Sequence, residues 1–202
     1  MVSGRQGVGI VFGMEPIWTP APARVEGSLL AHFMSVAGVE SYADLHARSI
    51  ADPAWFWRQV WDSCGVVGQA GDRVLIEGER MREAVFFPDA RLNVVDTLLA
   101  RNDDSLALMF RGEAGHALDM IWSELHARVS QYQQALREAA VGVGSRVAAM
   151  MANTPDIYAL MLATASVGAV FTSVSPDFGA AAAVDRFSQV EPDLLFASDR
   201  YY

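Results

Sequence analysis

The strongest candidate for binding chemistry is a five-residue run between a β-branched segment and an alanine-rich one. The run is Ser175, Pro176, Asp177, Phe178 and Gly179. The Ser175 hydroxyl can cap the helix that follows, while Pro176 has no backbone N–H to compete with that cap. Gly179 lacks a Cβ and lets a backbone or a ligand approach closely. The run predicts either a ligand-binding turn or a tight strand-to-helix turn without a ligand.

Other motifs give weaker signals. The glycines of residues 7–13 are spaced wrongly for a dinucleotide fingerprint, and those of residues 141–147 follow a helix and precede a strand, the reverse of a phosphate-binding order. Neither a GxSxG elbow nor a Walker loop occurs. The histidines show no metal-ligand spacing, and the acidic pairs lie in polar, turn-like segments, which favours solvated charge over acid–base catalysis. These residues are His32, His46, His116 and His126, and the pairs Asp103/Asp104 and Glu77/Glu79.

Composition indicates a globular protein and argues against nucleic acid as a partner. Hydrophobic residues make up 52% of the 202 residues, which is ample for a packed core. The net charge of −9 opposes binding to phosphate backbones or anionic lipid. No apolar run reaches the roughly 20 residues that a membrane span needs. The lone Cys64 predicts a buried thiol in a reducing compartment, the cytoplasm.

The N-terminal half predicts a mostly helical region. We expect residues 1–14 to form a disordered extension. Three prolines in residues 15–27 predict an extended arm without a helix, whose Trp18 docks on a neighbouring element. Two helices follow, one capped by Ser28 and one that begins at Asp52 with Pro53 in its first position. The second helix carries Trp57 and Trp61, for which core packing is a better interpretation than an aromatic ligand-binding box. A connector follows, and after it a short helix is expected near residues 93–100.

The C-terminal half predicts a hairpin followed by alternating strands and helices. Residues 106–122 form the hairpin, and the next helix is expected to begin at Ser123 as its cap and to end at Gly142. Residues 146–197 read strand, helix, strand, helix, strand, which predicts a parallel α/β unit with right-handed crossovers. In its second helix we expect Val184 to face inward.

Three segments are expected to meet where the parallel strands end. Residues 153–156, 175–179 and 198–202 each follow a predicted strand. Ligands of open parallel sheets bind beyond the carboxyl ends of the strands. The sequence therefore predicts a ligand-binding edge built from these segments. A nucleotide-binding dehydrogenase is disfavoured, because no glycine fingerprint follows the first strand.

Several separated motifs resemble adenylate-forming acyl-CoA synthetases. The run LMLATASVGAVFTSVSPDFGAAAAVDRFSQVEPDLLFASD resembles the N-terminal domain of that family, and its SPDFG is similar to acetoacetyl-CoA rather than acetyl-CoA synthetases. EPIWTP, DPAWFWRQVWD and FFPDARLN occur in the same order in the family. The resemblance covers most of the chain from Glu15 onward. It implies an α/β fold with a mostly helical N-terminal accessory region at residues 15–100, followed at residues 101–202 by the first part of the large adenylate-forming domain with its parallel sheet.

The resemblance also implies a reaction and a binding site. The family uses ATP and magnesium to convert a carboxylic acid, here acetoacetate, to an acyl-adenylate, and CoA then displaces AMP. The turn of residues 175–179 would lie beside the CoA channel. In the acetyl enzymes Gly-Gly-Phe stands where this chain has Pro176, Asp177 and Phe178, so CoA contacts that depend on those glycines are altered.

The same resemblance predicts that the chain is an N-terminal fragment. The phosphate loop, the nucleotide motifs and the catalytic lysine of the family would follow Tyr202, so we expect no catalytic or metal-binding residue here and no activity of the chain alone. Two alternatives remain open. The chain is a non-enzymatic module that binds CoA or completes a separately encoded C-terminal half, or it is a non-functional remnant.

Overall fold

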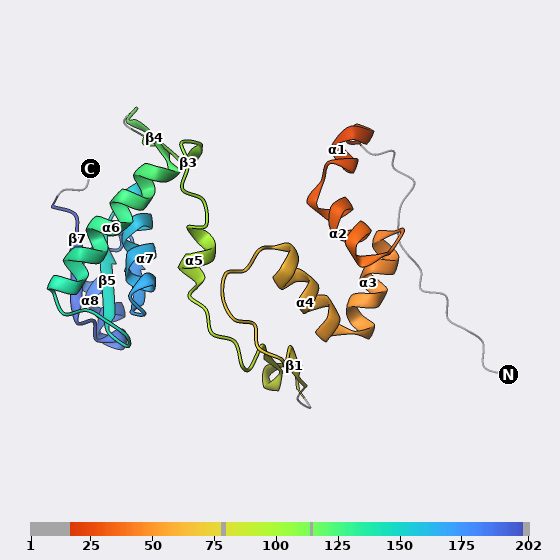
Figure 1. Ribbon diagram of the computed structural model, residues 1–202. Coiled ribbons are helices and arrows are strands. Elements are labelled where there is room, and N and C mark those ends of the chain that lie inside the picture. The colour runs from red at the N-terminus through yellow and green to blue at the C-terminus, as the bar shows by residue number, and fades with distance from the viewer. Residues whose placement is uncertain (1–16, 78–79, 114, 200–202) are drawn as a thin grey trace. The chain divides into compact units, whose positions relative to one another are not determined.

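The computed structural model describes residues 17–77, 80–113 and 115–199 (Figure 1). The predicted extension at residues 1–14 lies outside the described residues. The chain divides into two compact units, with the boundary between Gln59 and Val60. Within the described residues, no helix combines the length and the apolar character needed to cross a membrane.

The first unit is helical. Its helices are α1 (Pro22–Glu26), α2 (Leu29–Ala37), α3 (Tyr42–Ala51) and α4 (Pro53–Ser63), the last of which continues past the unit boundary. The Ser28 hydroxyl accepts a hydrogen bond from the N–H of Ala31 at 3.1 Å and caps α2. The Asp52 carboxylate accepts one from the N–H of Trp55 at 3.0 Å. Both predicted helix starts are therefore confirmed.

The predicted extended arm of residues 15–27 is wrong where α1 forms. Pro22 occupies the first helical position, where a missing N–H costs nothing because the first N–H groups of a helix have no partner within it. Trp18 is 66% exposed, and the guanidinium carbon of Arg24 lies 5.8 Å from the centroid of its ring. This arginine contact replaces the docking that was expected for Trp18.

The aromatic residues of α4 pack only partly. Trp61 packs on Phe87, with ring centroids 4.7 Å apart, and Trp57 contacts Phe56 at 5.4 Å while remaining 40% exposed. Cys64 follows α4 and is exposed, so the predicted burial of its thiol is wrong. The aromatic residues nearby do not extend their cover beyond the end of the helix.

The second unit begins with a connector and a hairpin and ends in a parallel sheet. In chain order its elements are β1 (Leu75–Ile76), η1 (Met81–Glu83), β2 (Val85–Phe86), α5 (Val94–Leu98), β3 (Leu106–Arg111), β4 (Ala117–Ile121), α6 (Trp122–Glu138), β5 (Arg146–Met150), α7 (Pro155–Ser166), β6 (Val170–Val174), η2 (Pro176–Phe178), α8 (Gly179–Val190) and β7 (Leu194–Ala197). β1 pairs with β2 and β3 with β4, both antiparallel. The other three strands are parallel in the order β6-β5-β7, which confirms the predicted α/β unit.

The core lies between the sheet and the helices α6 and α7. Leu125, Val129 and Leu136 project from α6 into a buried cluster that also contains Val147 of β5 and Leu162 of α7. The chain passes from β5 to β6 through α7 and then back across β5 to β7 through α8. Right-handed crossovers in opposite directions place α7 and α8 on opposite faces of the sheet.

Three local predictions in this unit fail for tertiary reasons. α6 begins at Trp122 rather than after Ser123. The N–H groups of these two residues donate to the carbonyls of Ser105 and Asp103 in the loop before β3, at 3.1 Å each, so neither needs a side-chain cap. After α6 the left-handed backbone falls on Ala140 (φ 58°), not on Gly142. Val184 is 66% exposed, and Ala183 is the buried residue of α8.

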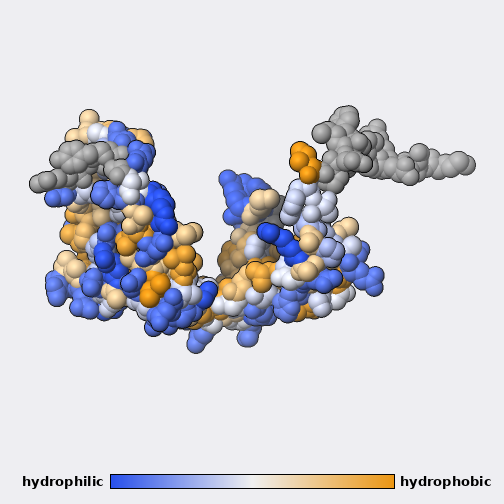
Figure 2. Space-filling view, turned by 90° about the horizontal axis from the view of Figure 1, so that it is seen from above, coloured by the Kyte–Doolittle hydropathy of each residue, from blue (hydrophilic) through white to orange (hydrophobic). Residues whose placement is uncertain are grey.

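The surface mixes hydrophilic and apolar residues (Figure 2). In the second unit the exposed apolar residues include Val143, Val184 and Leu195, with exposed fractions from 52% to 91%. Single exposed apolar residues are normal for globular proteins and indicate no site by themselves.

Asn93 joins two helices of the second unit. Its Oδ1 accepts a hydrogen bond from the N–H of Val95 at 3.0 Å and caps the N-terminus of α5. Its Nδ2 donates to the carbonyls of Ala165 and Ser166, at 2.9 and 3.3 Å, at the C-terminus of α7. Val95 beside it is only 2% exposed. A single amide therefore satisfies backbone groups at two helix ends and fixes α5 against α7.

We predict that Asn93→Ala lowers the free energy of unfolding of the second unit by about 1–3 kcal/mol, because a helix cap and two bonds to backbone carbonyls are lost together. Urea unfolding followed by circular dichroism measures the change. Asn102→Ala removes an exposed amide nearby and is the matched control, with an expected effect below about 0.5 kcal/mol. Equal effects of the two substitutions would contradict the role given to Asn93.

Candidate functional site

The carboxyl edge of the parallel sheet is level. Met150 of β5 pairs with Val174 of β6 and with Ala197 of β7, so all three strands end at the same height. The segments that follow the strands therefore leave from one edge of the sheet. They are residues 151–154, 175–179 and 198–199. Residues 200–202, which belong to the predicted third segment, lie outside the described residues.

The chain leaves the two neighbouring strands β5 and β6 in opposite directions. β5 leads into α7 on one face of the sheet, and β6 leads through η2 into α8 on the other face. In open parallel sheets, ligands bind outside the carboxyl ends at the point where connections diverge in this way. The topology thus favours the region between the start of α7 and the turn of residues 175–179.

The turn is closed by its own side chains. The Ser175 hydroxyl accepts a hydrogen bond from the N–H of Asp177 at 3.3 Å and donates one to the Asp177 carboxylate at 2.7 Å. Ser175 thereby caps the short helix η2, and the N-cap position of α8 falls on Phe178. The predicted capping role is confirmed for η2 only.

Gly179 is required by its backbone conformation. Its φ of 67° and ψ of 167° belong to a region that residues with a side chain essentially do not adopt. No heavy atom lies within 4 Å of the position that a Cβ would occupy. The backbone at the start of α8 is therefore open to an approaching molecule.

Arg186 adds a positive charge beside the turn, and it is not among the residues predicted from the sequence. Phe178 is 51% exposed, and the guanidinium carbon of Arg186 lies 4.4 Å from the centroid of its ring. Arg186 is seven residues after Gly179, about two helical turns, and helical side chains tilt toward the helix N-terminus. The spacing in the sequence could have predicted this contact, because a long side chain two turns into a helix can reach back to the beginning of that helix.

The first turn of α7 is held from α6. The Asp156 carboxylate pairs with Arg128 at 2.5 Å and accepts a hydrogen bond from the Tyr132 hydroxyl at 3.1 Å. Burial, followed by the charge of Asp156, raises the pKa of Tyr132 above its ordinary value. Tyr132 also makes an edge contact with Phe196 of β7, with ring centroids 6.1 Å apart. α6 therefore supports two of the three strand ends.

A pocket of about 330 Å³ opens between β3 and the first turn of α7. It is lined by residues 108–111 of β3 and by Asn153, Thr154, Pro155 and Tyr158. The Arg111 guanidinium in this lining pairs with Asp119 at 2.5 Å, so its charge is already matched. No residue of the turn at residues 175–179 contributes to the pocket.

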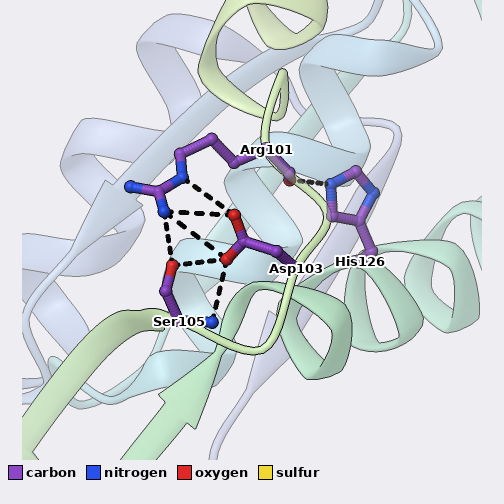
Figure 3. Close-up of polar contacts among 4 residues, drawn as sticks. All are labelled: Arg101, Asp103, Ser105 and His126. Atoms are coloured by element: carbon purple, nitrogen blue, oxygen red, sulfur yellow. Dashed lines mark hydrogen bonds and ion pairs between the residues drawn. The ribbon is translucent and has the colours of Figure 1, made fainter.

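A cluster of Arg101, Asp103, Ser105 and His126 has the residue types of a nucleophilic site but not its connections (Figure 3). Nε2 of His126 lies 2.7 Å from the carbonyl oxygen of Arg101, whereas the Ser105 hydroxyl donates to the Asp103 carboxylate. A nucleophile needs a base within hydrogen-bond reach of its hydroxyl. The cluster instead fixes the loop before β3 onto α6.

The hydrogen bonds of this cluster lower the pKa of Asp103 to about 2. The Ser105 hydroxyl has the largest effect, and the Ser105 N–H and the Arg101 guanidinium add to it. Among the described residues, no group of three or more His, Cys, Asp or Glu side chains is arranged to hold a metal ion.

Comparison with known proteins identifies the class. Residues 96–201, more than half of the chain, match the AMP-binding enzyme family, and residues 42–97 match the acetyl-coenzyme A synthetase N-terminus. The chain therefore belongs to the AMP-binding enzyme family.

Within that family the chain is similar to acetoacetyl-CoA synthetases, as its motifs indicated. It is 46% identical over 193 residues to the acetoacetyl-coenzyme A synthetase of Rhizobium meliloti strain 1021, which covers 93% of this chain and 30% of the relative. It is 37% identical over 169 residues to a malonamoyl-CoA synthetase of Penicillium aethiopicum, covering 80% of this chain and 23% of the relative.

A solved structure extends the likeness to the fold. The acetoacetyl-CoA synthetase from Streptomyces lividans matches with a TM-score of 0.81 and 35% identity, over 93% of this chain and 31% of that one. The chain thus spans about a third or less of the length of these relatives. Its fold is that of the N-terminal part of an adenylate-forming enzyme.

We predict that Ser105→Ala raises the pKa of Asp103 toward its ordinary value of 3.8, because the hydroxyl that stabilises the carboxylate is removed. A folded-state pKa below the ordinary value means that this carboxylate stabilises the fold above about pH 4 and loses that effect as the pH falls toward 2. The ¹³C chemical shift of the Asp103 carboxyl carbon, followed against pH, measures the pKa. Ser123→Ala, whose hydroxyl contacts Asp104, is the control and should leave the Asp103 titration unchanged. An unchanged titration in Ser105→Ala would contradict the assignment.

Proposed function

We propose that this chain is the N-terminal part of an AMP-forming ligase that joins acetoacetate to CoA. The complete reaction converts ATP, acetoacetate and CoA to acetoacetyl-CoA, AMP and pyrophosphate. The observation that supports this most strongly is the 46% identity to an acetoacetyl-coenzyme A synthetase over 93% of the chain. Residues 15–100 would form the accessory region, and residues 101–202 would begin the adenylate-forming domain.

The names of two relatives support a class of acid. Acetoacetate and malonamate are both short carboxylates with a second carbonyl group at the third carbon. The relatives named for these acids are 46% and 37% identical to this chain. We therefore extend the proposal from acetoacetate to short acids that carry a carbonyl at this position.

The 202 residues alone are proposed to be inactive. Transfer of an adenylyl group requires concentrated positive charge beside the phosphates, which the family supplies with a loop lysine and magnesium. All fifteen basic residues of this chain are arginines, so neither the loop lysine nor the catalytic lysine can come from it. The described residues also lack a metal-binding group, and no step through magnesium is assigned to them.

The contribution proposed for this chain is part of the CoA site. The turn of Ser175, Pro176, Asp177, Phe178 and Gly179 follows β6 at the level edge of the sheet. Two features support binding there: the open backbone at Gly179 and the half-exposed ring of Phe178. Binding through the side chains of Phe178 and its surroundings would replace the backbone contacts that glycines give the acetyl enzymes.

We predict no acetoacetate-dependent pyrophosphate release by the purified chain with ATP, magnesium and CoA. A chimera in which residues 17–199 replace the matched region of the Rhizobium meliloti relative should release pyrophosphate with acetoacetate, because the missing lysines are then present. Both proteins are measured in a coupled pyrophosphate assay, with the unmodified relative as control. Release by the chain alone would contradict its inactivity, and a folded but inactive chimera would contradict the proposed ligase.

A further inference from the structure

The pocket between β3 and the first turn of α7 runs along an unpaired edge of β3. Among the described residues, β3 pairs only with β4. The N–H of Gly112 donates to the carbonyl of His116, just before β4, at 2.7 Å, and bonded pairs alternate along an antiparallel ladder. The backbone groups of Met109 and Arg111 therefore point away from β4. Both residues line the pocket, so each brings an N–H donor and a carbonyl acceptor to its wall.

The opposite wall carries polar side chains without a partner. Asn153, Thr154 and Tyr158 line it, and none of these side chains forms a hydrogen bond within the part of the chain that the structure describes. Thr154 holds the N-cap position of α7, where a threonine hydroxyl usually accepts a hydrogen bond from the helix, yet no such bond is found. An amide and two hydroxyls are therefore available to a ligand, both as donors and as acceptors.

Arg111 has one edge of its guanidinium occupied and one edge open. Nη1 and Nη2 donate to the Asp119 carboxylate at 2.5 and 3.2 Å, and Nη1 also donates to the carbonyl of Phe110 at 2.8 Å. No acceptor is found for the Nε–H among the described residues, so the edge of Nε and Nη2 can bind a second carboxylate side-on. The Asp119 side chain is 51% exposed, and exposed ion pairs are weak. A ligand can therefore share this guanidinium with Asp119.

The remaining lining limits the size and the charge of a ligand. Leu108, Phe110 and Pro155 supply apolar surface, and no acidic side chain is among the described residues that line the pocket. The volume of about 330 Å³ is at the lower end of the range for small-molecule sites. A small molecule with one anionic end, one neutral polar oxygen and a short hydrocarbon part matches these walls.

We propose that this pocket binds a short monocarboxylate that carries a hydroxyl or carbonyl oxygen. Its carboxylate lies on the open edge of Arg111, and its second oxygen lies among Asn153, Thr154 and Tyr158. The ligand thereby contacts both β3 and the start of α7, so its binding fixes the hairpin against the parallel-sheet unit. No step of the proposed ligase reaction uses this pocket, and the inference goes beyond that function.

The test is a titration of the labelled 202-residue chain, without ATP or CoA, followed by ¹H–¹⁵N spectra. The probes are 3-hydroxybutyrate for a hydroxyl acid and acetoacetate for an oxo acid. We expect a Kd on the order of 1 mM, because so small a ligand makes few contacts, and the largest shifts at the amides of Met109, Arg111 and Tyr158. Butyrate lacks the second oxygen and 1,3-butanediol lacks the carboxylate, so each should bind about fivefold more weakly or less.

Two variants break the same ion pair with opposite expected results. Arg111→Met removes the guanidinium and should weaken binding of the probes about tenfold. Asp119→Asn removes the competing carboxylate and keeps the guanidinium, so binding should become about twofold to threefold tighter. A purely structural role of the pair would change both variants in the same direction. Circular dichroism melting of each variant verifies that the fold is retained.

A third variant tests the opposite wall. Tyr158→Phe keeps the ring and loses the hydroxyl, so 3-hydroxybutyrate should bind about threefold more weakly while binding of butyrate stays unchanged. A preference for only one of the two probes supports the inference and assigns the second oxygen as a hydroxyl or a carbonyl.

Three results would overturn the inference: unchanged binding in Arg111→Met, equal weakening in Arg111→Met and Asp119→Asn, or equal affinity for butyrate and 3-hydroxybutyrate. The absence of shifts at the pocket with both probes would overturn it as well. None of these results bears on the proposed ligase or its CoA turn, which are tested with other ligands.

Discussion

Burial of β5 on both faces is the constraint on which the second unit depends. Three consecutive residues of this strand, Val147, Ala148 and Ala149, are fully buried. A central strand covered on both sides must pair with neighbours on both edges and must lie under helices on both faces. Its pairing with β6 and β7 sets the three strand ends level, and that alignment brings the following segments to one edge. The turn of residues 175–179 therefore has its position because of the packing of β5.

The other contacts of the unit support this arrangement. α6 packs with α7 over one face of the sheet and holds the first turn of α7 through the pairing of Arg128 with Asp156. Asn93 fixes the connector helix to the far end of α7. The polar cluster around Asp103 attaches the loop before β3 to α6. These groups resemble catalytic sets in composition, yet each is bonded to backbone or to an opposite charge, and its role is structural.

The sequence predicted those features of the fold that depend on local chemistry. The alternation of strands and helices after residue 146 was predictable, because buried strands, Pro155 at a helix start and Gly168 after a helix give signals within a few residues. The helix at Pro22 was missed although its signal is local, because a proline suits the first helical position. The exposure of Val184 and the left-handed Ala140 were not predictable, since packing and neighbouring carbonyls decide them. The five residues of the candidate turn were predicted from sequence, and their binding role stays a prediction, whereas Arg186 lies beside Phe178 only because of the path of α8.

The charges of the chain permit the CoA-binding role that we propose for its turn. The chain has no lysine to stabilise a reacting phosphate, but it places the Arg186 guanidinium, the exposed Phe178 ring and the open backbone at Gly179 at one turn. The most direct test is a two-dimensional ¹H–¹⁵N spectrum of the labelled chain titrated with CoA. We predict the largest shifts at the amides of Asp177, Phe178 and Gly179. Shifts concentrated in the pocket at Leu108 and Tyr158, or none at saturating CoA, would contradict it.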